Sequence, residues 1–157
     1  MENAYIFTTI LGDIKISESN NCITNIQFIK DPIELKSIPY VNETPLIMQA
    51  VTQIKEYLSG TRKQFDLPLN PSGTEFQKNV WHVLQMIPYG EHWSYKQVAI
   101  ALLKPTAARA VGMANNKNPI PIIIPCHRVI GANGDLVGYA GGLAIKEQLL
   151  NLEQGEL

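Results

Sequence analysis

Cys126, His127 and Arg128 are consecutive in the pentapeptide Pro125–Val129. A thiol becomes a nucleophile when it loses its proton, and a neighbouring base or cation favours that loss. The triplet is therefore a candidate for chemistry in which sulfur attacks an electrophile. The alternative is structural, because most free cysteines are buried and simply pack.

The segment before the cysteine is stiff. Pro119, Pro121 and Pro125 each restrict φ and remove a backbone donor around the apolar run Ile120–Ile124. The sequence thus predicts a thiol held still at the floor of a pocket. Consecutive residues point to opposite faces of an extended strand, so Cys126 and its neighbouring histidine can cooperate only if the chain turns here or a water bridges them.

The composition is that of one ordinary domain or two compact halves, with 157 residues of which 45% are hydrophobic. No apolar run is as long as a membrane span, and we expect no secretion signal, because the first residues lack a basic region followed by an apolar stretch. Two cysteines could form only one disulfide, which favours a reduced intracellular protein, in the cytoplasm or in a eukaryotic nucleus. Cys22 is expected to pack, and we expect no metal site, no membrane partner and no obligate protein partner.

Positive charge is concentrated in the second half. Between His92 and Gly134 there are five Lys or Arg residues and no Asp or Glu, whereas the rest of the chain has eight Lys or Arg against 14 acidic residues. A basic face on a chain of net charge −1 is a modest signature of nucleic-acid binding. An ordinary solvated face is the alternative.

The first half predicts a small α/β domain with an antiparallel sheet. Alternating apolar residues and polar turns indicate strands at Tyr5–Ile10, Ile14–Ser17 and Cys22–Ile29. Thr44 is expected to cap a helix that starts at Pro45 and ends at Ser59-Gly60. A short strand at Gln64–Leu67 and a linker from Pro68 to Gly73 complete this half.

The second half predicts helices. Thr74 and Ser94 each start a capping box, for one helix that runs toward Ile87 and another that ends near Leu103. A third helix, Ala107–Asn115, follows a tight turn, and the pair indicates a helix-turn-helix, although any helical hairpin could have this pattern. The last helix is expected at Leu143–Glu153, with Ile145, Leu149 and Leu152 facing the core.

From Thr74 to Glu153 the chain resembles the O6-alkylguanine-DNA alkyltransferase family. The segments that match in order and spacing are Ser94-Tyr95, Ala107–Gly112, Asn118-Pro119, Ile124–Val129, Gly138–Leu143, Lys146-Glu147 and Glu153. The resemblance implies an α+β protein. Its N-terminal α/β domain, residues 1–70, would contain a ribonuclease H-like sheet, and its mostly helical C-terminal domain, residues 71–157, would bind DNA and accept the alkyl group.

The resemblance also implies an activity: direct-reversal repair, in which O6-alkylguanine leaves the duplex and its alkyl group moves irreversibly to Cys126. His127 would accept the thiol proton through a water, and Glu153 would orient that histidine. Asn118 would brace the active-site turn, and Tyr95 would promote rotation of the nucleotide. The protein would act once, without a cofactor, as a monomer, and less well on O4-alkylthymine.

The remaining implied residues belong to the DNA face and the lesion pocket. Arg109 would fill the gap left by the rotated base, and small residues would let the helix enter the minor groove. Arg128 could position the backbone or contact DNA. The small residues are Ala107, Ala108, Ala110 and Gly112, and the pocket would be lined by Val129, Tyr139, Ala140 and Gly141.

Three other functions stay open from the residues. A lesion-binding relative without transfer activity would lack the reactive cysteine, and Cys126 argues against it. A cysteine hydrolase would need an oxyanion hole. A helix-turn-helix transcription factor would not need the Pro125–Val129 segment.

Overall fold

The computed structural model describes residues 2–31, 42–134, 138–139 and 141–155. The chain divides into two compact units, Met1–Pro71 and Ser72–Leu157. The first unit is a sheet with a helix, and the second is mostly helical. The α+β class expected from the sequence is confirmed.

The first unit contains an antiparallel sheet in the order β1 (Glu2–Thr9), β2 (Gly12–Ser19) and β3 (Cys22–Ile29). Both hairpins have two-residue turns, and the second uses Asn20 and Asn21 with φ of 51° and 60°. Asparagine tolerates this left-handed conformation, which suits the twist of a tight hairpin. Strand β3 has the predicted bounds, whereas β1 and β2 are longer than the sequence pattern predicts, and Ile10 lies in a turn instead of a strand.

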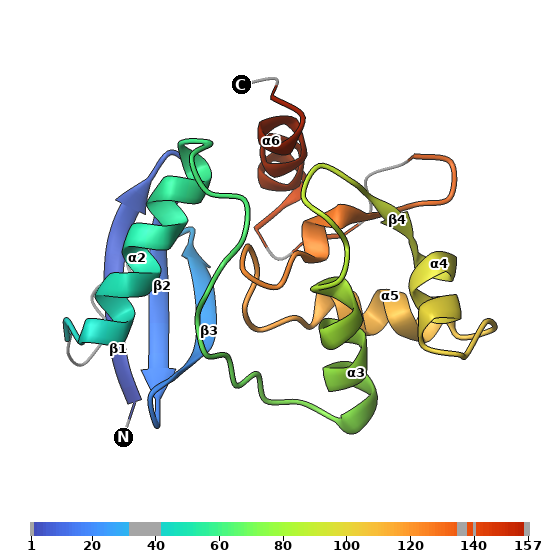
Figure 1. Ribbon diagram of the computed structural model, residues 1–157, viewed down its shortest axis with the longest axis horizontal. Helices are drawn as coiled ribbons and strands as arrows, with labels where there is room; N and C mark the ends of the chain where they lie inside the picture. The colour runs from blue at the N-terminus through green and yellow to red at the C-terminus, as the bar shows by residue number, and fades with distance from the viewer. Residues whose placement is uncertain (1, 32–41, 135–137, 140, 156–157) are drawn as a thin grey trace. The chain divides into compact units, whose positions relative to one another are not determined.

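Helix α2 (Pro45–Leu58) lies along one face of this sheet, as Figure 1 shows. Thr44 caps it, accepting a hydrogen bond from the backbone N–H of Ile47. Ile47 and Ile54 are completely buried, so the apolar side of this helix contributes to the core of the unit.

The strand predicted at Gln64–Leu67 is wrong. Only an isolated bridge forms, between Ile23 and Leu69. The side-chain amide of Gln53 accepts from the backbone N–H of Asp66 and donates to its carbonyl oxygen, so these groups cannot pair with a strand.

The second unit begins with α3 (Glu75–Leu84), which has the capping box expected at Thr74. Helices α4 (Tyr95–Ala101) and α5 (Ala108–Asn116) pack on each other as the expected helix-turn-helix. The Nε1 of buried Trp81 on α3 donates to the carbonyl of Ala114, 2.8 Å away, and so ties α3 to the last turn of α5.

The rest of the unit carries a short 3₁₀ turn, η1 (Cys126–Arg128), and helix α6 (Leu143–Glu153). Two short strands, β4 (Trp93–Ser94) and β5 (Val129–Ile130), pair in parallel. This pairing joins the entrance to α4 to the end of the 3₁₀ turn. Within the described residues, no helix is long and apolar enough to cross a membrane.

Candidate active site

Asn118 closes the loop that leads to the cysteine. Its Oδ1 accepts from the N–H of Ile120 at 2.9 Å, and its Nδ2 donates to the carbonyl of Ile124 at 2.8 Å. Ile122, between them, is buried with a φ of 74°, a conformation that costs a β-branched residue about 1–3 kcal/mol. The surrounding loop therefore holds a strained backbone immediately before the thiol.

Cys126 begins the 3₁₀ turn η1 and is 3% exposed. Its N–H donates to the carbonyl of Ile124, and the N–H of Arg128 donates to that of Pro125. The chain therefore turns at the cysteine, which removes the opposed orientation that an extended strand would impose on Cys126 and His127.

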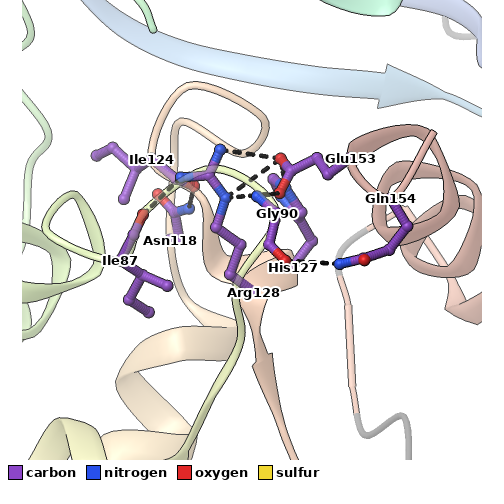
Figure 2. Close-up of polar contacts among 8 residues, drawn as sticks. All are labelled: Ile87, Gly90, Asn118, Ile124, His127, Arg128, Glu153 and Gln154. Atoms are coloured by element: carbon purple, nitrogen blue, oxygen red, sulfur yellow. Dashed lines mark hydrogen bonds and ion pairs between the residues drawn. The ribbon is translucent and has the colours of Figure 1, made fainter. Parts of the chain in front are cut away.

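His127 and Arg128 both bind the carboxylate of Glu153 on α6 (Figure 2). The Nε2 of the histidine lies 2.8 Å from Oε2, and the guanidinium donates to both carboxylate oxygens at 2.9–3.2 Å. All three side chains are buried. Because the Glu153 carboxylate can only accept, it favours the His127 tautomer that carries its proton on Nε2. In that tautomer Nδ1 is free of a proton and can take one up.

The same cluster holds the segment between α3 and β4. Arg128 also donates to the carbonyl of Ile87 at 2.7 Å, and its guanidinium lies 5.7 Å from the ring centre of Tyr89. The N–H of Gly90 donates to Glu153, and the Nε2 of Gln154 donates to the carbonyl of Gly90. Each of the three guanidinium nitrogens of Arg128 donates to a protein acceptor, either the carboxylate of Glu153 or the carbonyl of Ile87. These contacts support a positioning role, which is one of the two roles expected for Arg128.

Burial determines the direction of the pKa shifts of Cys126 and His127, whereas hydrogen bonds and charge determine that of Glu153. Burial raises the pKa of the Cys126 thiol to about 11, although the side chain of Asn118 and the charge of Lys146 act in the opposite direction. Burial lowers the pKa of His127 despite the carboxylate beside it. Burial alone would raise the pKa of Glu153, but hydrogen bonds from His127 and Arg128 outweigh it and hold that pKa at about 2. At neutral pH the site thus contains a protonated thiol, a neutral imidazole and a carboxylate.

Lys146 is a site residue to which the sequence analysis assigned no role. It is completely buried, and its Nζ donates to the carbonyl of Val129 at 2.7 Å. Burial lowers its pKa to about 8, and the charge of the Cys126 thiolate opposes that shift. The buried residues of α6 are Lys146, Leu149 and Glu153, whereas Ile145 and Leu152 are only half-buried.

The expected α6 stripe is completely buried at Leu149 and partly buried at Ile145 and Leu152, and the two charged residues Lys146 and Glu153 are buried beside it. Buried polar groups need partners, and the Val129 carbonyl and the Arg128 guanidinium supply them. The i, i+3, i+7 spacing of Lys146, Leu149 and Glu153 was visible in the sequence, but charged side chains normally face water. Hydrophobicity alone therefore could not predict that Lys146 and Glu153 are buried on this helix.

The residues expected on the DNA face lie on α4 and α5. Tyr95 is half-buried at the start of α4, and both burial and the nearby Cys126 raise its pKa. A Cβ on Gly112 would lie 3.7 Å from the Tyr95 ring, an ordinary van der Waals distance, so the space between the two helices would admit a methyl group at this position. Arg109 and Ala110 are exposed on α5, while Ala107 and Ala108 are half-buried. No contact links Arg109 to the buried cluster among the described residues.

The expected pocket residues are described only in part. Val129 is completely buried, and Tyr139 and Gly141 are half-buried. The N–H of Gly142 donates to the carbonyl of Tyr139. Ala140 lies outside the described residues. Across the described ranges, no three His, Cys, Asp or Glu side chains are grouped so that they could hold a metal ion.

Two family profiles together match most of the chain. Residues 4–71 match "6-O-methylguanine DNA methyltransferase, ribonuclease-like domain", and residues 75–155 match "6-O-methylguanine DNA methyltransferase, DNA binding domain". The two matched ranges correspond to the sheet-containing unit and the helical unit.

Curated relatives have the same family name. A protein of Methanosarcina barkeri named "Methylated-DNA--protein-cysteine methyltransferase" is 46% identical over 154 residues, which is 97% of each chain. A Bacillus subtilis protein with that name and the suffix "constitutive" is also 46% identical, over 93% of this chain and 92% of its own.

Solved structures of the same family are also similar to this chain. The crystal structure of Mycobacterium tuberculosis O6-methylguanine methyltransferase is 38% identical, with a TM-score of 0.88 over 100% of this chain and 95% of its own. The structure of Mycobacterium tuberculosis OGT in complex with DNA is 39% identical, with a TM-score of 0.87 over 98% and 94% of the two chains. The fold, the cysteine-containing turn and these matches together place the chain in the O6-methylguanine-DNA methyltransferase family.

Proposed function

We propose that this protein repairs DNA by transferring an alkyl group from the O6 atom of guanine to Cys126. The observation that carries the proposal is a buried Cys126 followed directly by a histidine whose Nε2 is bound to the buried carboxylate of Glu153, in a chain of this family. The curated relatives are named as methylated-DNA–protein-cysteine methyltransferases, which supports the same reaction here.

The chemistry is a displacement at the alkyl carbon. The bond from sulfur to carbon forms as the bond from carbon to O6 breaks, and the electron pair of that bond remains with the guanine. The thiol proton passes through a water to Nδ1 of His127, and the leaving guanine takes up a proton. Glu153 stabilises the imidazolium that forms in between, since its carboxylate stays charged.

The product is a thioether. Its sulfur is neither a leaving group for water nor reducible, so each protein molecule acts once and no cofactor enters the reaction. The high pKa of Cys126 suits this role, because a protonated thiol reacts slowly with stray electrophiles and oxidants.

Duplex DNA is the proposed partner. The alkylated base is hidden in the stack, so its nucleotide must rotate out before sulfur can reach it. Helix α5 would enter the minor groove with its small residues, Arg109 would fill the vacated space, and Tyr95 would crowd the target phosphate. Val129, Tyr139 and Gly141 would line the lesion pocket together with Ala140.

The finer features are proposals too. The protein would act as a monomer in a reducing intracellular compartment and would accept O4-alkylthymine less well than O6-alkylguanine. Sedimentation of the protein with and without a lesion-containing duplex would detect a larger assembly and contradict the monomer.

Intact mass after incubation with a duplex containing O6-methylguanine tests the function. We expect one added methyl group per protein, located on Cys126 by peptide mapping and absent from Cys126→Ala. Cys22→Ala is the matched control, because it removes the other thiol and should keep full transfer. Unchanged mass with tight binding would indicate a lesion-binding protein, and repeated turnover would indicate a different enzyme.

A further inference from the structure

Asn115 contacts the peptide of the nucleophile from the helix that would dock on DNA. It lies in the last turn of α5, is 2% exposed, and its Nδ2 donates to the carbonyl of Cys126 at 3.4 Å. The same carbonyl accepts from the N–H of Val129, which closes the 3₁₀ turn. A carbonyl oxygen has two lone pairs, so it can accept both hydrogen bonds.

The backbone of this last turn is itself fixed. The bond from Trp81 to the carbonyl of Ala114 holds the residue before Asn115, and both Trp81 and Ala114 are buried. Val111, one turn earlier on α5, is completely buried as well. Asn115 therefore extends from a rigid part of the helix toward Cys126.

The other end of the same amide is unsatisfied. Oδ1 of Asn115 is sealed from solvent, and no donor among the described residues reaches it. A buried acceptor without a partner destabilises a fold, whereas an apolar side chain of similar shape is nearly neutral or stabilising there. Packing and stability alone would therefore favour leucine at this position, which indicates that the amide has another role.

We propose that Asn115 is a positioning residue for alkyl transfer: it holds the backbone of Cys126 against α5, so that docking of the helix on DNA also places the sulfur. The inference rests on the proposed function. Displacement needs sulfur, carbon and oxygen in line, and a small misplacement of the nucleophile slows such a step strongly. Hydrogen bonds of this kind are often long in the free protein and shorten in the reacting complex.

The test compares Asn115→Leu with Gln53→Leu, a buried amide in the first unit that uses both its donor and its acceptor. Single-turnover methyl transfer from a duplex is measured against DNA concentration, and thermal unfolding is followed in parallel. We expect Asn115→Leu to keep or raise the melting temperature while the plateau rate constant falls about three- to tenfold at unchanged DNA affinity. Gln53→Leu should do the reverse, with a lower melting temperature and an unchanged rate constant.

Two further variants and a second substrate complete the design. Asn115→Ala lacks the same donor with less bulk, and it carries the test if the leucine does not fit. Asn115→Asp keeps the shape of the side chain but places a carboxylate against the carbonyl of Cys126, which it repels. Its rate constant should therefore be lower than those of Asn115→Leu and Asn115→Ala. Because the effect is on the position of sulfur, free O6-benzylguanine should react more slowly by a similar factor.

A plateau rate constant within twofold of the wild type in both Asn115→Leu and Asn115→Ala would overturn the inference. A loss of DNA affinity alone would also overturn it, because the residue would then act in docking only. Wild-type protein that takes up no methyl group would instead overturn the proposed function, and the two failures are therefore distinguishable.

Discussion

Cys126 is a protonated, enclosed thiol in the free protein, so a neighbouring group must accept its proton before or during attack. With a pKa of about 11, the thiol does not lose its proton to bulk water at neutral pH. A nearby acceptor has to take that proton as sulfur approaches carbon. His127 suits this role because burial keeps its imidazole neutral.

The pH dependence of alkyl transfer follows from His127. Since its pKa lies below the ordinary value of 6.5, the imidazole stays able to accept a proton down to that pH and loses the ability only at lower pH. We expect the rate constant with free O6-benzylguanine to be constant from pH 8 to 6.5 and to fall below that range. A rate already halved at pH 7 would contradict this, and His127→Gln should remove the acid limb together with most of the activity.

Glu153 links the site to stability. Its pKa is lowered from 4.5 to about 2, so the stabilisation it contributes is complete above pH 4.5 and is lost as the pH falls toward 2. Glu153→Gln leaves the buried guanidinium of Arg128 without its ion pair and should lower the free energy of unfolding by about 3 kcal/mol at pH 7. The difference from wild type should shrink in acid. Urea unfolding measures both effects, and Glu147→Gln, an exposed carboxylate on the same helix, is the control.

At the scale of elements, α5 combines two tasks. One surface of the helix carries exposed Arg109 and Ala110, and buried Val111, Ala114 and Asn115 pack inward. Helices α3 and α4 have capping boxes, whereas α5 has no side-chain cap. Its first N–H groups are thus not occupied by a capping side chain, which suits a helix that approaches a phosphate backbone.

Arg109→Ala tests the proposed role of the exposed surface of α5 in base extrusion. If Arg109 fills the space left by the rotated base, its loss should slow transfer from duplex DNA about tenfold and leave reaction with free O6-benzylguanine within twofold. Arg62→Ala removes a partly exposed arginine of the first unit and should change neither rate. Equal slowing of the two substrates by Arg109→Ala would show that the residue does not act in extrusion.

At the scale of the whole molecule, the net charge of −1 limits nonspecific attraction to DNA. Of the five basic residues between His92 and Gly134, Arg128 is buried in an ion pair. The other four, Lys96, Lys104, Arg109 and Lys117, are exposed. Attraction to the phosphate backbone should therefore come from a few residues of the second unit.

The salt dependence of binding measures this directly. Four neutralised phosphates correspond to a slope of about −4 for the logarithm of the binding constant against the logarithm of salt concentration. We expect a slope no steeper than that for an undamaged duplex, and a loss of about one unit in Lys104→Gln if Lys104 contacts a phosphate. A slope beyond about −6 would mean that further cations, outside this region, contact the DNA.

The sequence by itself predicted most of the helices, the three-stranded sheet and the residue proposed here as the nucleophile. Local signals are strong at Thr44, Thr74 and Ser94, because a cap and its helix lie within a few residues of each other, and all three caps form as predicted. The strand expected at Gln64–Leu67 did not form, since its competitor was the distant side chain of Gln53. A pattern of neighbouring residues cannot predict a hydrogen-bond partner that is distant in the chain.

Only the tertiary structure decided which polar groups are buried and whom they bind. The sequence left two roles open for Arg128 and indicated none for Lys146 or Asn115. In the structure each of the three is buried and bound to a group brought close by folding. Charges and amides enter a protein interior only when partners compensate their lost hydration, and those partners lie 11 to 25 residues away. Cys126 could therefore be proposed as the nucleophile from its neighbours in the sequence, whereas its protonation and the residues that hold it depend on contacts that exist only after the chain has folded.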